Sequence, residues 1–165
     1  MHPSYFSGDQ RHDLAVLRLA TPVAGYHLAV RPVCLPPPAL ATENGDVCWA
    51  SGWGRDVVQY DSTTAPLADV VVHFTSTGVC QLTLASKEPL TYLWSGLCLQ
   101  AVDVDGDLCK LDPGSPVVCA SGGRGATLAG VVSWAHRCAG RHHAPLIVAT
   151  AIASHLDWIG AALQT

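Results

Sequence analysis

The segment DLCKLDPGSPVVC, residues 107–119, carries the strongest indication of the fold. Cys109 and Cys119 bracket a short stretch that is rich in glycine and proline. Residues of these two types mark tight turns, and the apolar run 116–119 that follows is typical of a short strand. The segment therefore predicts a tight loop between two cysteines, leading into a β-strand.

The composition is that of a globular protein. Of the 165 residues, 49% are hydrophobic and 13% are charged, so the chain can bury one good core or two small ones that share an interface. The net charge of −4 gives no reason to expect nucleic acid or an anionic membrane as a partner. No apolar run approaches the length that spans a bilayer.

Seven cysteines are many for a chain of this size, and none forms the C-x-x-C pair of a zinc site. A disulfide framework, and with it an oxidising compartment, is the better interpretation. The first residues are not followed by an apolar stretch, so we predict no signal peptide. Together with the odd number of cysteines, this leads us to expect a fragment, an internal piece of a precursor or a mis-started reading frame.

The 107–119 segment resembles the nucleophile loop of the trypsin-like (chymotrypsin-fold, peptidase S1) serine proteases, which reads D-S-C-Q-G-D-S-G-G-P-L-V-C. Both cysteines, Asp112, Gly114 and Pro116 fall on family positions without a gap. The nucleophilic serine of the family is replaced by Pro113. The resemblance implies a serine-protease fold whose chemistry has been removed.

Other segments match the family in chain order. They are HPSY at 2–5, HDLAVLRL at 12–19, VCLP at 33–36, CWASGWG at 48–54, GVVSW at 130–134 and the Trp158-Ile159 dipeptide. The implied fold is all-β, a chymotrypsin-like antiparallel Greek-key β-barrel with a C-terminal α-helix. The implied domains are a remnant of the N-terminal barrel at 1–30, an inter-barrel linker at 31–47, and the C-terminal barrel with its terminal helix at 48–165.

Residue patterns predict the individual elements. A capping-box-like start at 154–157, followed by apolar Leu156, Ile159 and Leu163 on one face, predicts the helix. Cys80 and Cys98 bracket what reads as a polar loop. Strands are expected from residue patterns at 12–19, 66–74, 97–99, 116–119 and 127–134, and the resemblance implies further strands at 48–54 and 145–148.

The cysteine connectivity follows only from the resemblance, because spacing alone leaves many pairings open. The family implies three disulfides and leaves Cys34 unpaired, because the usual partner of this cysteine lies upstream of the protease domain. The implied pairs are Cys48–Cys119, Cys80–Cys98 and Cys109–Cys138.

The catalytic positions of the family are largely replaced. Pro113 has neither a side-chain oxygen nor an N–H, so it removes both the nucleophile and one oxyanion donor. The other donor position holds Leu111, whose side chain we expect to crowd the site. Asp13 matches the triad aspartate, although the residues alone favour a strand-entry or capping carboxylate, and the segment carrying the catalytic histidine is missing. Ser115 is expected to be a buried turn serine.

The substrate pocket is half kept. Asp107 matches the pocket-floor aspartate, and Ser133, Trp134 and Ala135 match the pocket wall, with alanine in place of the family's glycine. Leu146 also replaces a glycine, and we expect it to project into the pocket and fill it. We predict no binding of arginine or lysine side chains.

A second cluster of polar residues surrounds Cys138. A metal site, an anion-binding loop or a heparin-like surface would each fit, but an exposed polar loop fits better, because the spacing matches no ligand set. We expect neither a metal nor a cofactor. The cluster consists of His136, Arg137, Arg141, His142 and His143.

These observations predict a secreted, extracellular pseudoprotease, similar to the inactive domains of polyserases. It would bind a protein or peptide partner, a missing N-terminal barrel or a neighbouring protease domain. One alternative is an active serine endopeptidase, if upstream sequence supplies a histidine and a nucleophile. The other is a truncated fragment without an independent function.

Overall fold

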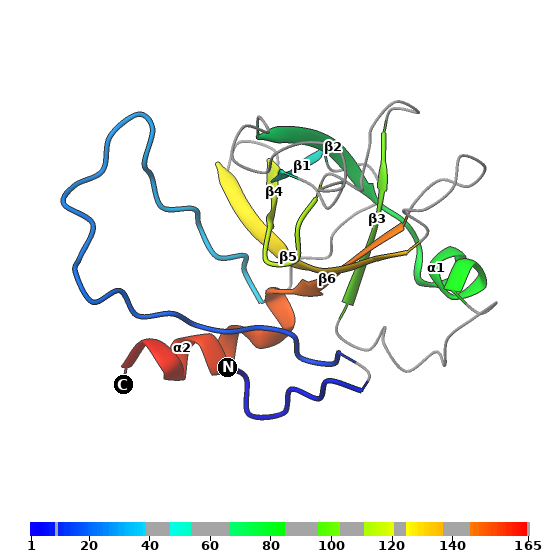
Figure 1. Ribbon diagram of the computed structural model, residues 1–165, viewed down its shortest axis with the longest axis horizontal. Coiled ribbons are helices and arrows are strands. Elements are labelled where there is room, and N and C mark those ends of the chain that lie inside the picture. Colours follow the sequence, from blue (N-terminus) through cyan, green and yellow to red (C-terminus); the bar gives the residue numbers. More distant parts are fainter. Residues whose placement is uncertain are drawn as a thin grey trace.

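The computed structural model describes residues 1–8, 10–38, 47–53, 67–84, 96–102, 111–120, 125–136 and 146–164. Figure 1 shows a β-barrel with a terminal helix, and a long N-terminal segment that runs outside the barrel past this helix. The all-β class and the C-terminal helix predicted from the sequence are confirmed.

The barrel is closed and antiparallel throughout. Its strand order is β1-β2-β3-β6-β5-β4, so the first strand also pairs with the fourth. Closure leaves no strand edge unpaired, which removes a template for aggregation. The strands are β1 (Cys48–Gly52), β2 (Ala68–Phe74), β3 (Gly96–Ala101), β4 (Pro116–Ala120), β5 (Ala126–His136) and β6 (Leu146–Ala151).

Alternating apolar residues fill the barrel. In β2, Val70, Val72 and Phe74 are buried, whereas the residues between them are partly exposed, as the period of a strand requires. They join a single core with side chains from each of the remaining strands, including Leu99 and Ile147. A second cluster lies around helix α1 and comprises Cys80, Leu84, Cys98, Leu146 and Val148.

A β-bulge interrupts the pairing of β5 with β6 at Ser133. Val132 pairs with Ala149 and Trp134 pairs with Val148, so Ser133 is the extra residue. A bulge redirects the side chain that it carries. Here the bulge allows two consecutive side chains to be buried. Val132 faces the core, and Ser133 contacts the N-terminal segment.

Helix α1 (Thr77–Leu84) takes up the first residues of the stretch between Cys80 and Cys98, where a polar loop was expected, so the prediction was wrong for residues 81–84; residues 85–95 lie outside the described residues. Ser76 precedes the helix, and its Oγ accepts a hydrogen bond from the Val79 N–H at 3.3 Å. Serine at this position is a standard N-cap. The disulfide Cys80–Cys98 fastens the helix to β3.

The C-terminal helix is confirmed, but its predicted start was wrong. A 3₁₀ turn, η3 (Ala153–His155), leads into α2 (Leu156–Gln164), and the N-cap is Ile152 without a side-chain hydrogen bond. The turn therefore begins before Ser154 can act as a cap. Ile159 is buried as expected, whereas Leu163 is 64% exposed.

The strand expected at 12–19 does not form. Among the described residues, no strand pairs with this segment through backbone hydrogen bonds, and a strand needs a partner for its N–H and C=O groups. Leu17 is 86% exposed and Leu19 is exposed as well. Isolated bridges join Phe6 to Arg11 and His27 to Val30.

The disulfide Cys48–Cys119 joins β1 to β4 across a directly paired position. Cys34 is exposed and free, and its backbone carbonyl accepts a hydrogen bond from the Leu128 N–H of β5 at 2.9 Å. The two cysteines of the third implied pair, Cys109 and Cys138, lie outside the described residues.

Candidate functional site

Asp13 is held against the barrel from two sides. Its Oδ2 accepts a hydrogen bond from Ser133 Oγ at 2.7 Å, and its backbone carbonyl accepts one from Thr150 Oγ1 at 3.0 Å. Ser133 belongs to β5 and Thr150 to β6, and both are buried. These bonds fix the carboxylate at the position that the resemblance assigns to a triad aspartate.

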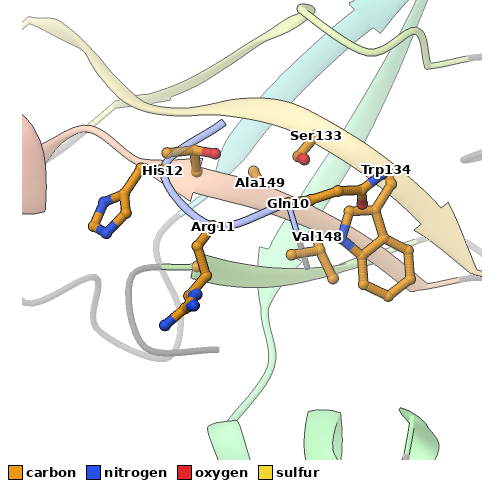
Figure 2. Close-up of a pocket in the computed structure, with 9 residues that line it drawn as sticks. Gln10, Arg11, His12, Ser133, Trp134, Val148 and Ala149 are labelled. Carbon is orange, nitrogen blue, oxygen red and sulfur yellow. The ribbon is translucent and has the colours of Figure 1, made fainter. Parts of the chain in front are cut away.

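A small cavity lies beside Asp13, where the chain at Gln10–His12 passes next to β5 and β6 (Figure 2). Ser133 and Trp134 line it together with this segment. Its volume is about 10 Å³, which is the space of one water molecule. Substrate and ligand pockets are typically about 300 Å³ or larger, so this cavity does not hold a substrate residue.

The loop at the nucleophile position is a turn at Pro113 and Gly114, with Gly114 at φ +94° in the left-handed region. Its N–H groups are bonded within the protein. Asp112 N–H donates to Ser115 Oγ at 3.3 Å, Gly114 N–H donates to Val132 O at 2.7 Å, and Ser115 N–H donates to Asp112 O at 2.9 Å. Since Pro113 has no N–H, residues 112–115 offer no donor to an oxyanion.

Leu111, which the resemblance assigns to the second oxyanion position, faces inward. Its side chain is 3% exposed and packs in the barrel core. The expectation that this side chain crowds the site was therefore wrong. Burying a leucine side chain is worth roughly 1.5–3 kcal/mol, which favours keeping this part of the loop in its inward position.

The neighbouring polar side chains have structural partners. Asp112 Oδ2 accepts a hydrogen bond from the Trp53 backbone N–H at 2.8 Å, which ties the loop to the end of β1. Ser115 is nearly buried, and its hydroxyl accepts the Asp112 bond described above, as expected of a turn serine. Its own N–H and carbonyl are also bonded within the protein.

The predicted pocket residues are spread over two environments. Ser133 is bonded to Asp13, Trp134 packs against the second cluster, and Ala135 is exposed. Leu146 is fully buried in the second cluster. Asp107 lies outside the described residues, so the filling of the pocket by Leu146 remains a prediction. Arg137, Arg141, His142 and His143 also lie outside them.

A group of three histidines was missed by the sequence reasoning. The ligand atoms of His2, His12 and His155 lie within 4.8 Å of one another. His12 and His155 are 143 positions apart, so no motif spacing could reveal the group. Only the packing of the N-terminal segment against the C-terminal turn brings these residues together.

Comparison with known proteins agrees with the fold. The family model described as Trypsin matches residues 1–159. Transmembrane protease serine 5 from Homo sapiens is 36% identical over 96% of this chain, and Inactive CLIP domain-containing serine protease A3 from Aedes aegypti is 33% identical over the same share. The chain spans 33% of the length of each of these two relatives.

The solved structure of Kallikrein-related peptidase 10 matches with a TM-score of 0.64 at 24% identity, over 88% of this chain and 62% of that one, which supports the fold alone. None of the described helices is long and apolar enough to span a bilayer. The match over residues 1–159 and the closed antiparallel barrel agree, and the chain belongs to the trypsin family, of which it is a trypsin-like serine protease domain.

Proposed function

We propose that this trypsin-like domain has no protease activity and serves as a binding or structural module. The observation that carries the proposal is the turn at Pro113. This residue provides neither a nucleophile nor an N–H, and the adjacent N–H groups of Asp112, Gly114 and Ser115 are bonded to protein acceptors.

The size of the effect can be judged from known enzymes. Removing one oxyanion donor costs about 10²–10³ in kcat. Loss of triad members leaves only about 10³–10⁴ of rate enhancement over water, and that remainder depends on the oxyanion hole and on substrate binding. Here the nucleophile and one oxyanion donor are both lost at Pro113, so no measurable hydrolysis is expected.

The environment of Asp13 supports the same conclusion. Within the described part of the chain, the hydrogen bond to its carboxylate comes from Ser133. The neighbouring His12 points its Nδ1 at His155 instead, at 3.0 Å. Asp13 therefore acts as an anchor of the N-terminal segment and orients no imidazole for proton transfer.

The names of two relatives mark those proteins as inactive, which supports the proposal. Besides the Aedes aegypti protein, Inactive CLIP domain-containing serine protease A28 from Anopheles gambiae is 31% identical over 96% of this chain. Their similarity supports a role in which the barrel is retained for its surface.

The surface proposed for binding is the N-terminal segment with its exposed apolar side chains. Leu17 and Leu28 are 86% and 90% exposed, and Tyr26 and Leu19 are also exposed. Large apolar side chains that are exposed close together on a surface are typical of an interaction site. We propose that a protein partner, either an N-terminal barrel or a neighbouring protease domain, covers it in an extracellular setting. In this proposal residues 1–30 are a remnant of the first barrel, 31–47 are the linker and 48–165 are the second barrel with its helix.

The test is labelling of the purified protein with a fluorophosphonate probe, which reacts with activated serines. Active trypsin is the positive control, and cooperative thermal unfolding shows that the sample is folded. We expect no labelling, and no hydrolysis of arginine or lysine peptides above the buffer rate. Labelling at Ser115, or turnover that disappears in a Ser115→Ala variant, would overturn the proposal.

A further inference from the structure

Three imidazole rings meet where the N-terminal segment crosses the start of the C-terminal helix. His2 and His12 come from the segment, and His155 ends the 3₁₀ turn η3. His2 stacks on His12 with ring centroids 4.7 Å apart and meets His155 edge-on at 5.3 Å. Trp158 covers His2 at 4.8 Å from the next turn.

His155 is oriented by the backbone. Its side chain is 3% exposed, and its Nδ1 lies 2.7 Å from the carbonyl oxygen of Ala151. A carbonyl only accepts hydrogen bonds, so Nδ1 carries the proton and the lone pair of Nε2 is free to face the other rings. Histidines that bind metals are characteristically held by a hydrogen bond of this kind from the second ring nitrogen.

The lone pair of His155 faces His12, whose Nδ1 lies 3.0 Å from Nε2. His12 has a φ of +54°, in the left-handed region that residues other than glycine adopt infrequently. Such backbone conformations persist where the surrounding structure enforces them, and they cluster at functional sites. The conformation of His12 therefore supports a site at this place.

His2 completes the group. Its backbone N–H donates to the carbonyl of Leu14 at 2.8 Å, which fixes the start of the segment beside the other two rings. Burial, followed by repulsion from His12 and His155, lowers the pKa of His2. The three rings thus present one ligand atom each, all within 4.8 Å of one another.

We propose that His2, His12 and His155 bind a zinc ion, with water as the fourth ligand. A tetrahedral site with Zn–N distances of about 2.0–2.1 Å places its nitrogen atoms roughly 3.3 Å apart, close to the 3.0 Å between His12 Nδ1 and His155 Nε2. Imidazole ligands suit zinc, copper and nickel, whereas calcium and magnesium require oxygen ligands.

Binding requires only small changes. The zinc ion takes the place of the proton between His12 and His155, and that proton moves to His12 Nε2 through solvent. The Ser4 N–H donates an exposed hydrogen bond to His2 Nδ1. When either ring nitrogen of His2 binds zinc, this bond is lost and the Ser4 N–H bonds to water instead. The bound ion would then join His2 and His12 to the η3 turn, adding to the contacts of Asp13 with the barrel.

The test uses the full chain after treatment with a chelator. Zinc is titrated by calorimetry, and cobalt(II) is titrated by visible absorption, because a tetrahedral cobalt site has a characteristic spectrum. The variants are His2→Ala and His12→Asn, since asparagine tolerates left-handed backbone. His73→Ala is the matched control, because His73 lies on β2 outside the group.

We expect one equivalent of zinc in the parent and in the control. His2→Ala and His12→Asn should each lower the affinity for zinc by at least about 100-fold. Removing a residue that only orients a metal ligand typically costs roughly 10–100-fold, so a larger loss indicates direct binding. Amide hydrogen exchange of residues 2–14 should slow when zinc is added to the parent and stay unchanged in the variants. Undiminished zinc binding in both variants, or no binding by the folded parent, would overturn the proposal. Binding lost only in a His142→Ala/His143→Ala variant would overturn it too.

Discussion

Replacing Cys48 and Cys119 together by alanine is expected to lower the free energy of unfolding by roughly 4 kcal/mol through the unfolded chain alone. The disulfide joins residues with a sequence separation of 71, and the entropy that it removes from the unfolded state grows with the loop that it closes. The same replacement at Cys80 and Cys98, with a separation of 18, should cost roughly 3 kcal/mol.

The comparison between the two pairs isolates the contribution of loop entropy. All four cysteines are nearly or fully buried, so the cavities left by alanine contribute similar losses. The difference of about 1 kcal/mol corresponds to roughly 2–4 °C in Tm for a chain of this size. Removal of Cys80–Cys98 should also speed amide exchange in α1, because this disulfide fastens the helix to β3.

Urea denaturation of both double variants, in a Cys34→Ser background that prevents thiol exchange, measures the two losses. The m-value of each variant is compared with that of the parent to verify that the unfolded states are comparable. If the Cys80 and Cys98 variant loses more stability than the Cys48 and Cys119 variant, the loop-entropy reasoning is refuted. A loss below about 1 kcal/mol in both would refute it equally.

Three further outcomes follow from the structure. Among the described cysteines only Cys34 should react with a maleimide in the native protein, as read by peptide mass mapping. Ser133→Ala should lower the free energy of unfolding by about 1–2 kcal/mol, because it removes the hydrogen bond to the Asp13 carboxylate, and an equal urea midpoint would contradict this. Because the pKa of His2 is lowered in the folded protein, the unfolded chain binds more protons, and the free energy of unfolding should fall as the pH drops below 6.5. This dependence of stability on pH should be weaker in His2→Ala. An unchanged profile of urea midpoint against pH in that variant would speak against the prediction.

The barrel could be predicted because its strands carry local signals. The β-branched run in β2 and the continuous apolar run around Val131 in β5 each indicate a strand without reference to distant residues. Helix α1 could also have been found, since Ser76 is a suitable N-cap before an apolar stretch. The strand expected around Leu17 does not form, because a strand needs a pairing partner and local residue patterns do not show whether one is present.

The candidate site was predictable in its residues but not in its geometry. The resemblance identified Pro113, Leu111 and Asp13 in chain order. The inward direction of Leu111 depends on the packing of the finished barrel, and the hydrogen bonds of the loop depend on Val132 in another strand. The histidine group depends on a contact across almost the full chain, so the sequence contained no signal for it.

The hydrolytic activity of a Pro113→Ser variant tests the central claim most directly. The claim is that the chemistry has been lost beyond the nucleophile position, because among the described residues the Asp13 carboxylate is bonded to Ser133 and the neighbouring His12 points at His155. We therefore predict no fluorophosphonate labelling and no hydrolysis of arginine or lysine peptides above the buffer rate in this variant. Measurable turnover from this single substitution would contradict the account.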